Sequence, residues 1–220
     1  MASPVASHTS AAYLWSMYLV KTPWWLRALY PSFIWKINTD EKVLYLTFDD
    51  GPHKTATPFV LDELKKYQAK ATFFCIGKNV AEYRNLYERI VAEGHTVGNH
   101  TYRHLNGWKT NKEEYNNDIK LASAEIDSNL FRPPYGRIMR NQSAIISSAF
   151  SIIMWDVLSG DFDVTITPEK CLSNVLQHTQ SGSIIVFHDS TKAWDRLRYC
   201  LPKMLEYFSE KGYSFKSITV

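Results

Sequence analysis

Short apolar runs alternate along the chain with longer stretches whose apolar residues recur at helical spacing. The short runs predict seven strands, at residues 43–48, 71–76, 95–98, 129–132, 151–155, 183–187 and 213–217. The longer stretches predict six helices, at residues 57–68, 78–93, 111–127, 140–149, 168–179 and 194–211. Such regular alternation indicates a parallel sheet with right-handed crossover connections. Seven strands in 220 residues favour a single α/β barrel over an open sheet.

Residues 11–36 depart from this pattern because they are rich in aromatic side chains. Charged residues and prolines interrupt the segment, so it falls short of the ~20 consecutive apolar residues that span a bilayer. It also lacks the basic start and the small-residue cleavage site of a secretory signal. Two interpretations stay open: packing along the barrel, which we favour, or peripheral membrane contact with its Trp and basic residues at headgroup level. Residues 1–41 are therefore expected to form an extension of one of these kinds.

Bulk composition excludes several classes of protein. A hydrophobic content of 45% supports a large core, and 21% charged residues argue against disorder. The formal net charge of +3, without a run of basic residues, gives no reason to expect a nucleic-acid partner. The three cysteines show no metal-binding spacing. We expect Cys75 to be a small buried hydrophobe, and a Cys171–Cys200 bridge has no support from sequence alone.

Two adjacent carboxylates, Asp49 and Asp50, follow the apolar run at 43–46, and Gly51-Pro52 ends the strand directly after them. Taken alone, this string is typical of a turn. Neighbouring side chains on a strand point in opposite directions, however, so the two acids are suited to different tasks. One is suited to bind a metal and the other to act as a general base towards water.

His100 and His104 are four residues apart, which places both imidazoles on one face of a helix or of a tight loop. This spacing is common by chance, but together with Asp50 it makes a set of two nitrogens and one oxygen. Such a set suits Zn²⁺, and Co²⁺ or Ni²⁺ would also fit. Three protein ligands leave coordination positions open, which is typical of metal-assisted hydrolysis.

Four further residues follow other predicted strands, at the barrel face where active sites collect. Arg132 closes the fourth strand, Asp161 lies in the loop after the fifth, and His188 follows the sixth. Arg132 is suited to pair with a carboxylate, and the backbone amide of Tyr135 in a stiff Pro-Pro-Tyr-Gly loop is suited to donate to an oxyanion. His188 is a natural acid for an amine leaving group, and Asp161 is suited to orient it.

These residues fall in five motifs that resemble those of the polysaccharide deacetylases of carbohydrate esterase family 4. The motifs occur in the family's order, as TFDDGP at 47–52, HTYRH at 100–104, RPPYG at 132–136, WDVLSGDF at 155–162 and VFH at 186–188. The resemblance covers roughly residues 42–217 and implies a distorted (β/α)7 barrel. Residues 42–220 are accordingly expected to be a single polysaccharide deacetylase catalytic domain.

The resemblance also implies a role for each site residue. By it, Asp49 is the general base, and Asp50, His100 and His104 hold the metal. Arg132 orients Asp49, the Tyr135 amide completes the oxyanion site, and Asp161 supports His188 as general acid.

The chain departs from the family in the walls of the substrate pocket. The family's Asp-x-x-Asp-Trp pattern here becomes Leu158-Ser159-Gly160-Asp161-Phe162, so the first acid and the Trp are replaced. Phe162 is expected to take the place of the Trp, and Val186 stands where Leu is usual. Trp155 is a further candidate substrate-binding residue, and Trp108 and Tyr135 are candidates for stacking against sugars.

The sequence thus predicts a metal-dependent hydrolase that removes acetyl groups from N-acetylated amino sugars of the chitooligosaccharide or peptidoglycan type. Metal-activated water, an Asp base and a His acid are the expected machinery. An O-acetyl esterase acting on xylan and a catalytically weak carbohydrate-binding homologue are the alternatives. The expected partner is an acetylated oligo- or polysaccharide, and a monomer is expected. Such substrates suggest the cell envelope or the extracellular space, although a cytoplasmic location stays open because no export signal is evident.

Overall fold

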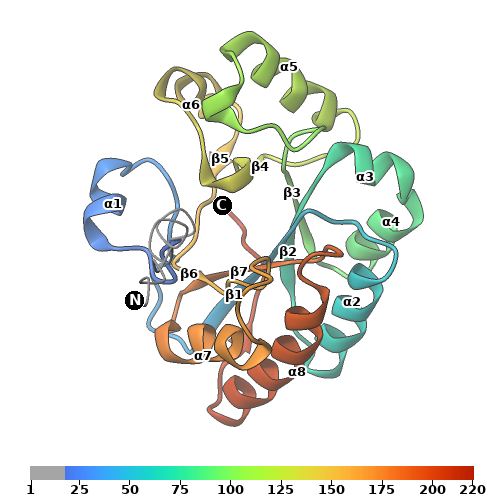
Figure 1. Ribbon diagram of the computed structural model, residues 1–220, viewed down its shortest axis with the longest axis vertical. Helices are drawn as coiled ribbons and strands as arrows, with labels where there is room; N and C mark the ends of the chain where they lie inside the picture. The colour runs from blue at the N-terminus through green and yellow to red at the C-terminus, as the bar shows by residue number, and fades with distance from the viewer. Residues whose placement is uncertain (1–17) are drawn as a thin grey trace, which may run out of the picture.

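A parallel β-sheet forms the centre of the computed structural model, which describes residues 18–220 (Figure 1). Its strands run in the order β5-β4-β3-β2-β1-β7-β6, and β8 pairs with β1 beside this path. The strands are β1 (Val43–Asp49), β2 (Ala71–Cys75), β3 (Thr96–Asn99), β4 (Leu130–Phe131), β5 (Ser151–Ile152), β6 (Val157–Leu158), β7 (Ile184–His188) and β8 (Ser214–Phe215). All pairs between these strands are parallel.

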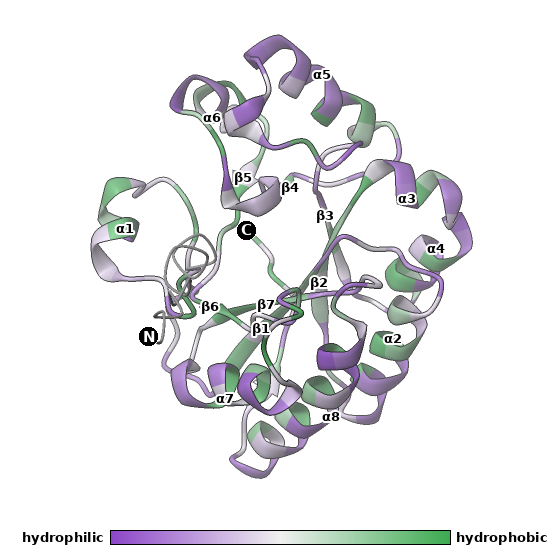
Figure 2. Cartoon of the chain, in the orientation of Figure 1, coloured by the Kyte–Doolittle hydropathy of each residue, from purple (hydrophilic) through white to green (hydrophobic). Residues whose placement is uncertain are grey.

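Helices surround the sheet on its outer side (Figure 1). They are α1 (Trp24–Leu29), α2 (Ala56–Lys66), α3 (Gly77–Glu82), α4 (Arg84–Ala92), α5 (Lys112–Ser123), α6 (Arg140–Ile146), α7 (Pro168–His178) and α8 (Trp194–Glu210). Strands β1 and β2 are almost fully buried, and helices such as α2 and α8 turn apolar faces to the interior and polar faces outward (Figure 2). The prediction of a single-domain (β/α)7 barrel with parallel strands is confirmed.

The sheet does not close by pairing β5 with β6, which lie at the two ends of the strand order. Residues of the N-terminal segment occupy this seam. Ile34 forms a parallel bridge to Ile153, and Lys21 forms an antiparallel bridge to Val157. The bridges satisfy backbone groups that the two edge strands would otherwise leave unpaired. Residues 18–36 therefore complete the wall of the barrel, whereas residues 11–17 of the aromatic segment lie outside the described residues.

Two predicted elements differ clearly in extent from the structure, and one strand was missed. The helix predicted at 78–93 is two helices, because Tyr83 takes a non-helical conformation (φ −119°, ψ 51°) between α3 and α4. The strand predicted at 151–155 ends at Ile152, and the chain beyond it pairs with Ile34, whose amide donates to the Ile152 carbonyl and whose carbonyl accepts from the Met154 amide. Strand β6 was missed because two residues carry no readable periodicity. The seventh predicted strand is β8, which lies beside the main path of the sheet.

The three cysteines are buried and free, so no disulfide joins Cys171 on α7 to Cys200 on α8. Cys75 lies fully buried in the main core cluster, as predicted. Across residues 18–220, no helix combines the length and the apolar character that crossing a bilayer requires.

Candidate active site

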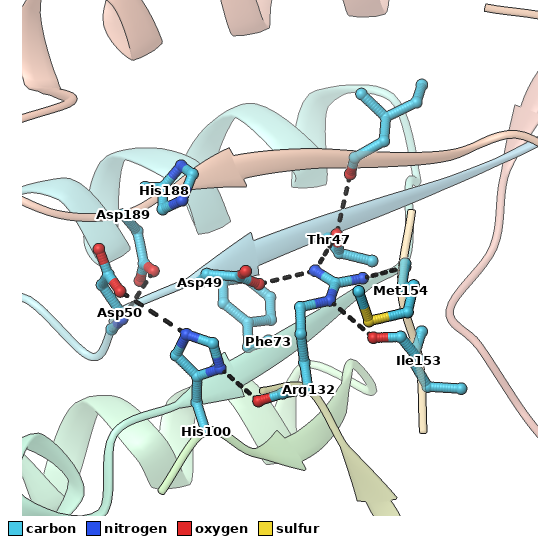
Figure 3. Close-up of polar contacts among 12 residues, drawn as sticks. Thr47, Asp49, Asp50, Phe73, His100, Arg132, Ile153, Met154, His188 and Asp189 are labelled. Carbon is cyan, nitrogen blue, oxygen red and sulfur yellow. Dashed lines mark hydrogen bonds and ion pairs between the residues drawn. The ribbon is translucent and has the colours of Figure 1, made fainter. Parts of the chain in front are cut away.

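The predicted site residues gather at the carboxyl ends of the strands (Figure 3). Asp49 ends β1 and is paired in register with His188, which ends β7. His100 directly follows β3, and Arg132 directly follows β4. Asp161 follows β6 rather than the fifth predicted strand, because the missed strand β6 precedes it. Parallel strands bring these separate segments to one end of the barrel, as proposed for this fold class.

Arg132 lies beneath this end and holds Asp49 in place. Its guanidinium donates to Asp49 Oδ1 over 2.7 Å and to Thr47 Oγ1 over 2.7 Å. It also donates to the backbone carbonyls of Ile153 and Met154, over 3.1 and 2.9 Å. The side chain is fully buried, and burial lowers the pKa of its guanidinium. Four of the five N–H groups thus donate hydrogen bonds, and the arginine holds the Asp49 carboxylate in place beside its positive charge.

Asp50, His100 and His104 form a compact cluster of donor atoms, all within 4.8 Å of one another. Asp50 Oδ1 lies 3.2 Å from His104 Nε2 and 3.9 Å from His100 Nε2. The Nδ1 of His100 donates to the Arg132 carbonyl over 2.7 Å, which leaves its Nε2 lone pair facing Asp50. The two histidines lie on a loop rather than on a helix.

This donor set fits a divalent metal ion. Asp50 Oδ1 is buried and has no hydrogen-bond partner among the described residues, which is costly unless a cation lies against it. Burial lowers the pKa of His100 to about 4, so its ring is neutral near neutral pH, as a ligand must be. One oxygen and two nitrogens suit a borderline ion and leave coordination positions open. The three residues are therefore a candidate metal site.

The backbone of the site is unusual. Of the five described non-glycine residues with positive φ, four lie in the site, namely Asp50 (82°), Thr101 (63°), His104 (59°) and Tyr135 (61°). Such conformations cost energy and persist where surrounding contacts enforce them. Asp118 provides such contacts, since its buried carboxylate accepts from the amides of Tyr102 and Arg103 over 2.8 and 2.9 Å. The Tyr135 amide has no backbone hydrogen bond to the described residues and stays available to a ligand.

His188 is held by Asp161 through two contacts. The ring Nδ1 lies 2.7 Å from Asp161 Oδ1, and the backbone amide of His188 donates to Oδ2 over 2.7 Å. Burial opposes the charge on His188, but the fully buried Asp161 carboxylate outweighs it and raises the pKa of His188 to about 10. The ring of Phe162 packs edge-on against the imidazole with centroids 5.2 Å apart. The imidazole is thus a well-oriented proton donor.

Asp189, which directly follows His188, also belongs to the site. It is fully buried and accepts from the Gly51 amide over 3.0 Å and from the Thr57 hydroxyl. A Cβ on Gly51 would lie 2.0 Å from Asp189 Oδ2, so only glycine fits there. Burial raises the pKa of Asp189 to about 8. The residue anchors the loop that follows Asp50.

A cavity of about 690 Å³ opens over these residues. The predicted site residues Asp49, Asp50, His100, His104, Tyr135, Trp155, Phe162, Val186 and His188 all line it, as does Trp108. Arg132 and Asp161 do not line it, because they lie buried behind Asp49 and His188. A second cavity of about 360 Å³ shares Asp50, His104 and Lys192 with the first. The metal-ligand cluster therefore lies where two cavities meet.

Part of the cavity wall was not predicted as such. Leu26, Tyr30, Phe33 and Trp35, all from the N-terminal segment, line it. The aromatic composition of this segment was visible in the sequence, but nothing in its spacing indicated that it reaches the site. Only its bridges at the seam bring it there.

Comparison with known proteins identifies the relatives of the chain. Residues 36–149 match the family model described as polysaccharide deacetylase. A peptidoglycan-N-acetylglucosamine deacetylase of Bacillus cereus is 40% identical over 153 residues, covering 66% of this chain and 55% of that protein, so the chain spans about half of its length. A second deacetylase of that name and organism is 32% identical over 195 residues, covering 84% of this chain and 90% of that protein.

Solved structures agree in fold. A peptidoglycan N-acetylglucosamine deacetylase, determined in complex with 4-naphthalen-1-yl-N-oxidanyl-benzamide, superposes with a TM-score of 0.82 at 32% identity. The match covers 90% of this chain and 95% of that one.

Proposed function

The chain belongs to the polysaccharide deacetylase family, and we propose that it removes acetyl groups from N-acetylated amino sugars by hydrolysis. One observation carries the proposal. Asp49, held by Arg132, and His188, held by Asp161, stand at the ends of two paired strands. Both lie beside the proposed metal-ligand cluster. Amide hydrolysis needs a base for water and an acid for the amine, and these two groups are placed to serve as such.

In this proposal Asp49 accepts a proton from the attacking water, and its hydrogen bond from Arg132 holds the carboxylate in position for that task. The free amide of Tyr135 donates a hydrogen bond to the carbonyl oxygen as negative charge develops there. His188 protonates the departing amine, and Asp161 holds the imidazole in the required orientation. Trp155, Phe162 and Val186 form the walls around the acyl group.

Asp50, His100 and His104 are proposed to hold one zinc ion, with Co²⁺ or Ni²⁺ as ions of similar fit. A divalent ion bound there supplies Lewis acidity to the acyl carbonyl and favours ionisation of water. His100 is prepared for ligation by its hydrogen bond to the Arg132 carbonyl, which directs Nε2 at the site.

An oligo- or polysaccharide is the proposed substrate, since the two cavities meet at Asp50 and His104 and leave room on both sides of the scissile bond. The relatives are named for peptidoglycan and for chitooligosaccharides. We infer that the protein works in the cell envelope, where peptidoglycan lies. The expectation of a monomer and that of membrane contact through residues 11–36 remain predictions.

The test is release of acetate, with matching appearance of free amine, from chitooligosaccharides, peptidoglycan fragments and acetylxylan. We expect release from one of the two N-acetylated substrates, loss of activity with a chelator, and recovery with Zn²⁺. Release from acetylxylan alone would identify an O-acetyl esterase instead. His188→Ala distinguishes an amide hydrolase from an O-acetyl esterase further. It should reduce hydrolysis of an amide more than that of an ester, because an alkoxide leaving group needs less protonation than an amine. No release from any substrate by the zinc-loaded protein would contradict the proposal.

A further inference from the structure

The main cavity is larger and more apolar than an acetyl group requires. Besides the catalytic residues and the polar side chains of Thr22, Arg137 and Lys192, its lining includes six neighbouring apolar side chains, namely Leu26, Tyr30, Phe33, Trp35, Ile138 and Met154. These residues belong to one packed cluster, in which Phe33, Trp35, Ile138 and Met154 are buried. An acetyl group presents a single methyl, which can cover only a small part of this apolar surface.

This apolar part of the cavity, termed the apolar end, begins beside the proposed catalytic residues. Arg132, which holds Asp49, also donates to the Met154 carbonyl, so Met154 and the base share one guanidinium. Val186 lies two residues before His188 on β7 and therefore on the same face of the strand. Its register partner is Leu158 on β6, which also lines the cavity where the family pattern places an acid. The change from an acid to leucine makes this wall apolar.

The arrangement of polar groups indicates which part of the substrate enters this end. A carbonyl carbon carries an oxygen, a nitrogen and an alkyl group. In the proposed reaction the oxygen belongs with the metal-ligand cluster and the Tyr135 amide, and the nitrogen belongs with His188. Met154 and Trp155, which also line the cavity near Asp49, offer apolar surface to the third substituent, the alkyl part of the acyl group.

We propose that the cavity accepts N-acyl groups longer than acetyl, with the alkyl chain lying against Leu26, Trp35 and Met154. This inference rests on the proposed function, because the same site performs the same hydrolysis. Water adds its oxygen to the acyl carbon and the C–N bond breaks. Asp49 takes a proton from the water and His188 gives one to the amine. The products are a free amino sugar and a fatty carboxylate, and no oxidant or reductant is consumed.

The direct test compares a series of glucosamine disaccharides that differ only in the N-acyl group, from acetyl through propanoyl and butanoyl to hexanoyl. Burial of each added methylene should raise kcat/KM by about fourfold until the cavity is filled. A fall of about tenfold or more from acetyl to butanoyl would overturn the inference, because a closed methyl pocket rejects added carbons. That result would leave the proposed deacetylation intact, whereas inactivity on every member would refute both.

A variant locates the chain within the cavity. Leu26→Trp fills the apolar end from α1, and Leu29→Trp on the same helix is the control, since Leu29 is 56% exposed and does not line the cavity. We expect Leu26→Trp to reduce kcat/KM for the hexanoyl substrate at least tenfold more than for the acetyl one. Leu29→Trp should leave kcat/KM for both substrates unchanged.

A separate series of acetylated oligosaccharides of increasing length distinguishes the acyl chain from a neighbouring sugar ring. If Leu26→Trp instead penalises longer sugars and leaves the acyl preference unchanged, the apolar end binds sugar and the inference fails. The acyl series on the unmodified protein remains decisive if Leu26→Trp does not fold.

Discussion

Arg132 and Asp49 form a buried ion pair with 2.7 Å between Nη1 and Oδ1, and the guanidinium at its centre is wholly enclosed. The pair joins the end of β1 to the residue after β4, two segments that are more than 80 positions apart in the chain. The face of Phe74 lies 4.1 Å from the guanidinium carbon and adds a cation–π contact. One arginine thus supports both the packing of the fold and the carboxylate proposed as the general base.

Replacement of Arg132 by methionine should therefore affect both. Arg132→Met leaves the Asp49 carboxylate buried without its partner, and we expect a loss of about 3–5 kcal/mol in the free energy of unfolding. Urea unfolding measures this loss. Arg198→Ala is the control, because the Arg198 side chain is 56% exposed and its pair with Asp195 should contribute at most about 1 kcal/mol. Equal stability of the two variants would contradict the interpretation of the buried pair.

Removal of a metal ligand should abolish tight metal binding. We expect Asp50→Ala and His104→Ala to weaken zinc affinity at least about 100-fold, because each deletes one of only three protein donors. Metal content after dialysis, measured by elemental analysis, reports this without an activity assay. His178→Ala, an exposed histidine at the end of α7, should keep the stoichiometry of the unmodified protein. Retention of one zinc per chain in either ligand variant would refute the assignment.

The charge on Asp161 should set the alkaline limit of activity. A general acid works only while protonated, and the raised pKa of His188, about 10, keeps its ring protonated through neutral pH. Asp161→Asn keeps a polar contact but removes the negative charge, so the pKa of His188 falls. We expect the alkaline limb of the kcat/KM profile to move at least about 2 pH units lower. If the pH profiles of kcat/KM for the unmodified protein and for Asp161→Asn coincide, Asp161 does not control the pKa of His188.

His95 should make the protein less stable in mild acid. The ring is buried against Phe73, and its Nδ1 accepts from the Ala71 amide over 3.2 Å. Burial, assisted by the charge of Lys70, lowers the pKa of His95 to about 4. Below about pH 6.5 the imidazole is therefore protonated in the unfolded state but still neutral in the folded state. The free energy of unfolding consequently decreases as the pH falls below that value.

Asparagine at position 95 keeps an acceptor for the Ala71 amide but does not titrate. Between about pH 7.5 and about pH 5.5 the unmodified protein should lose about 1 kcal/mol more of unfolding free energy than His95→Asn does. Urea unfolding at both values measures the difference. His100, whose pKa is also lowered, is present in both proteins, so its contribution cancels in this comparison.

Local patterning determined much of the fold. Strands of five to seven residues, such as β1, β2 and β7, contain continuous apolar runs that are recognisable in the sequence. The two-residue strands β4, β5 and β6 bury too few side chains to produce a pattern, so their boundaries were wrong or they were missed. The break at Tyr83 was hidden because residues on both sides favour a helix.

By itself, the sequence determined which residues are candidates for the site and the end of the barrel at which they lie. Asp49 and His188 each end a strand, His100 and Arg132 each directly follow one, and parallel strands share one direction. What only the tertiary structure decided was the shape of the space around them. Residues 26–35 line the cavity because the seam between β5 and β6 leaves backbone groups that the N-terminal segment pairs with. Such pairing depends on contacts across more than 100 residues, which no local pattern records.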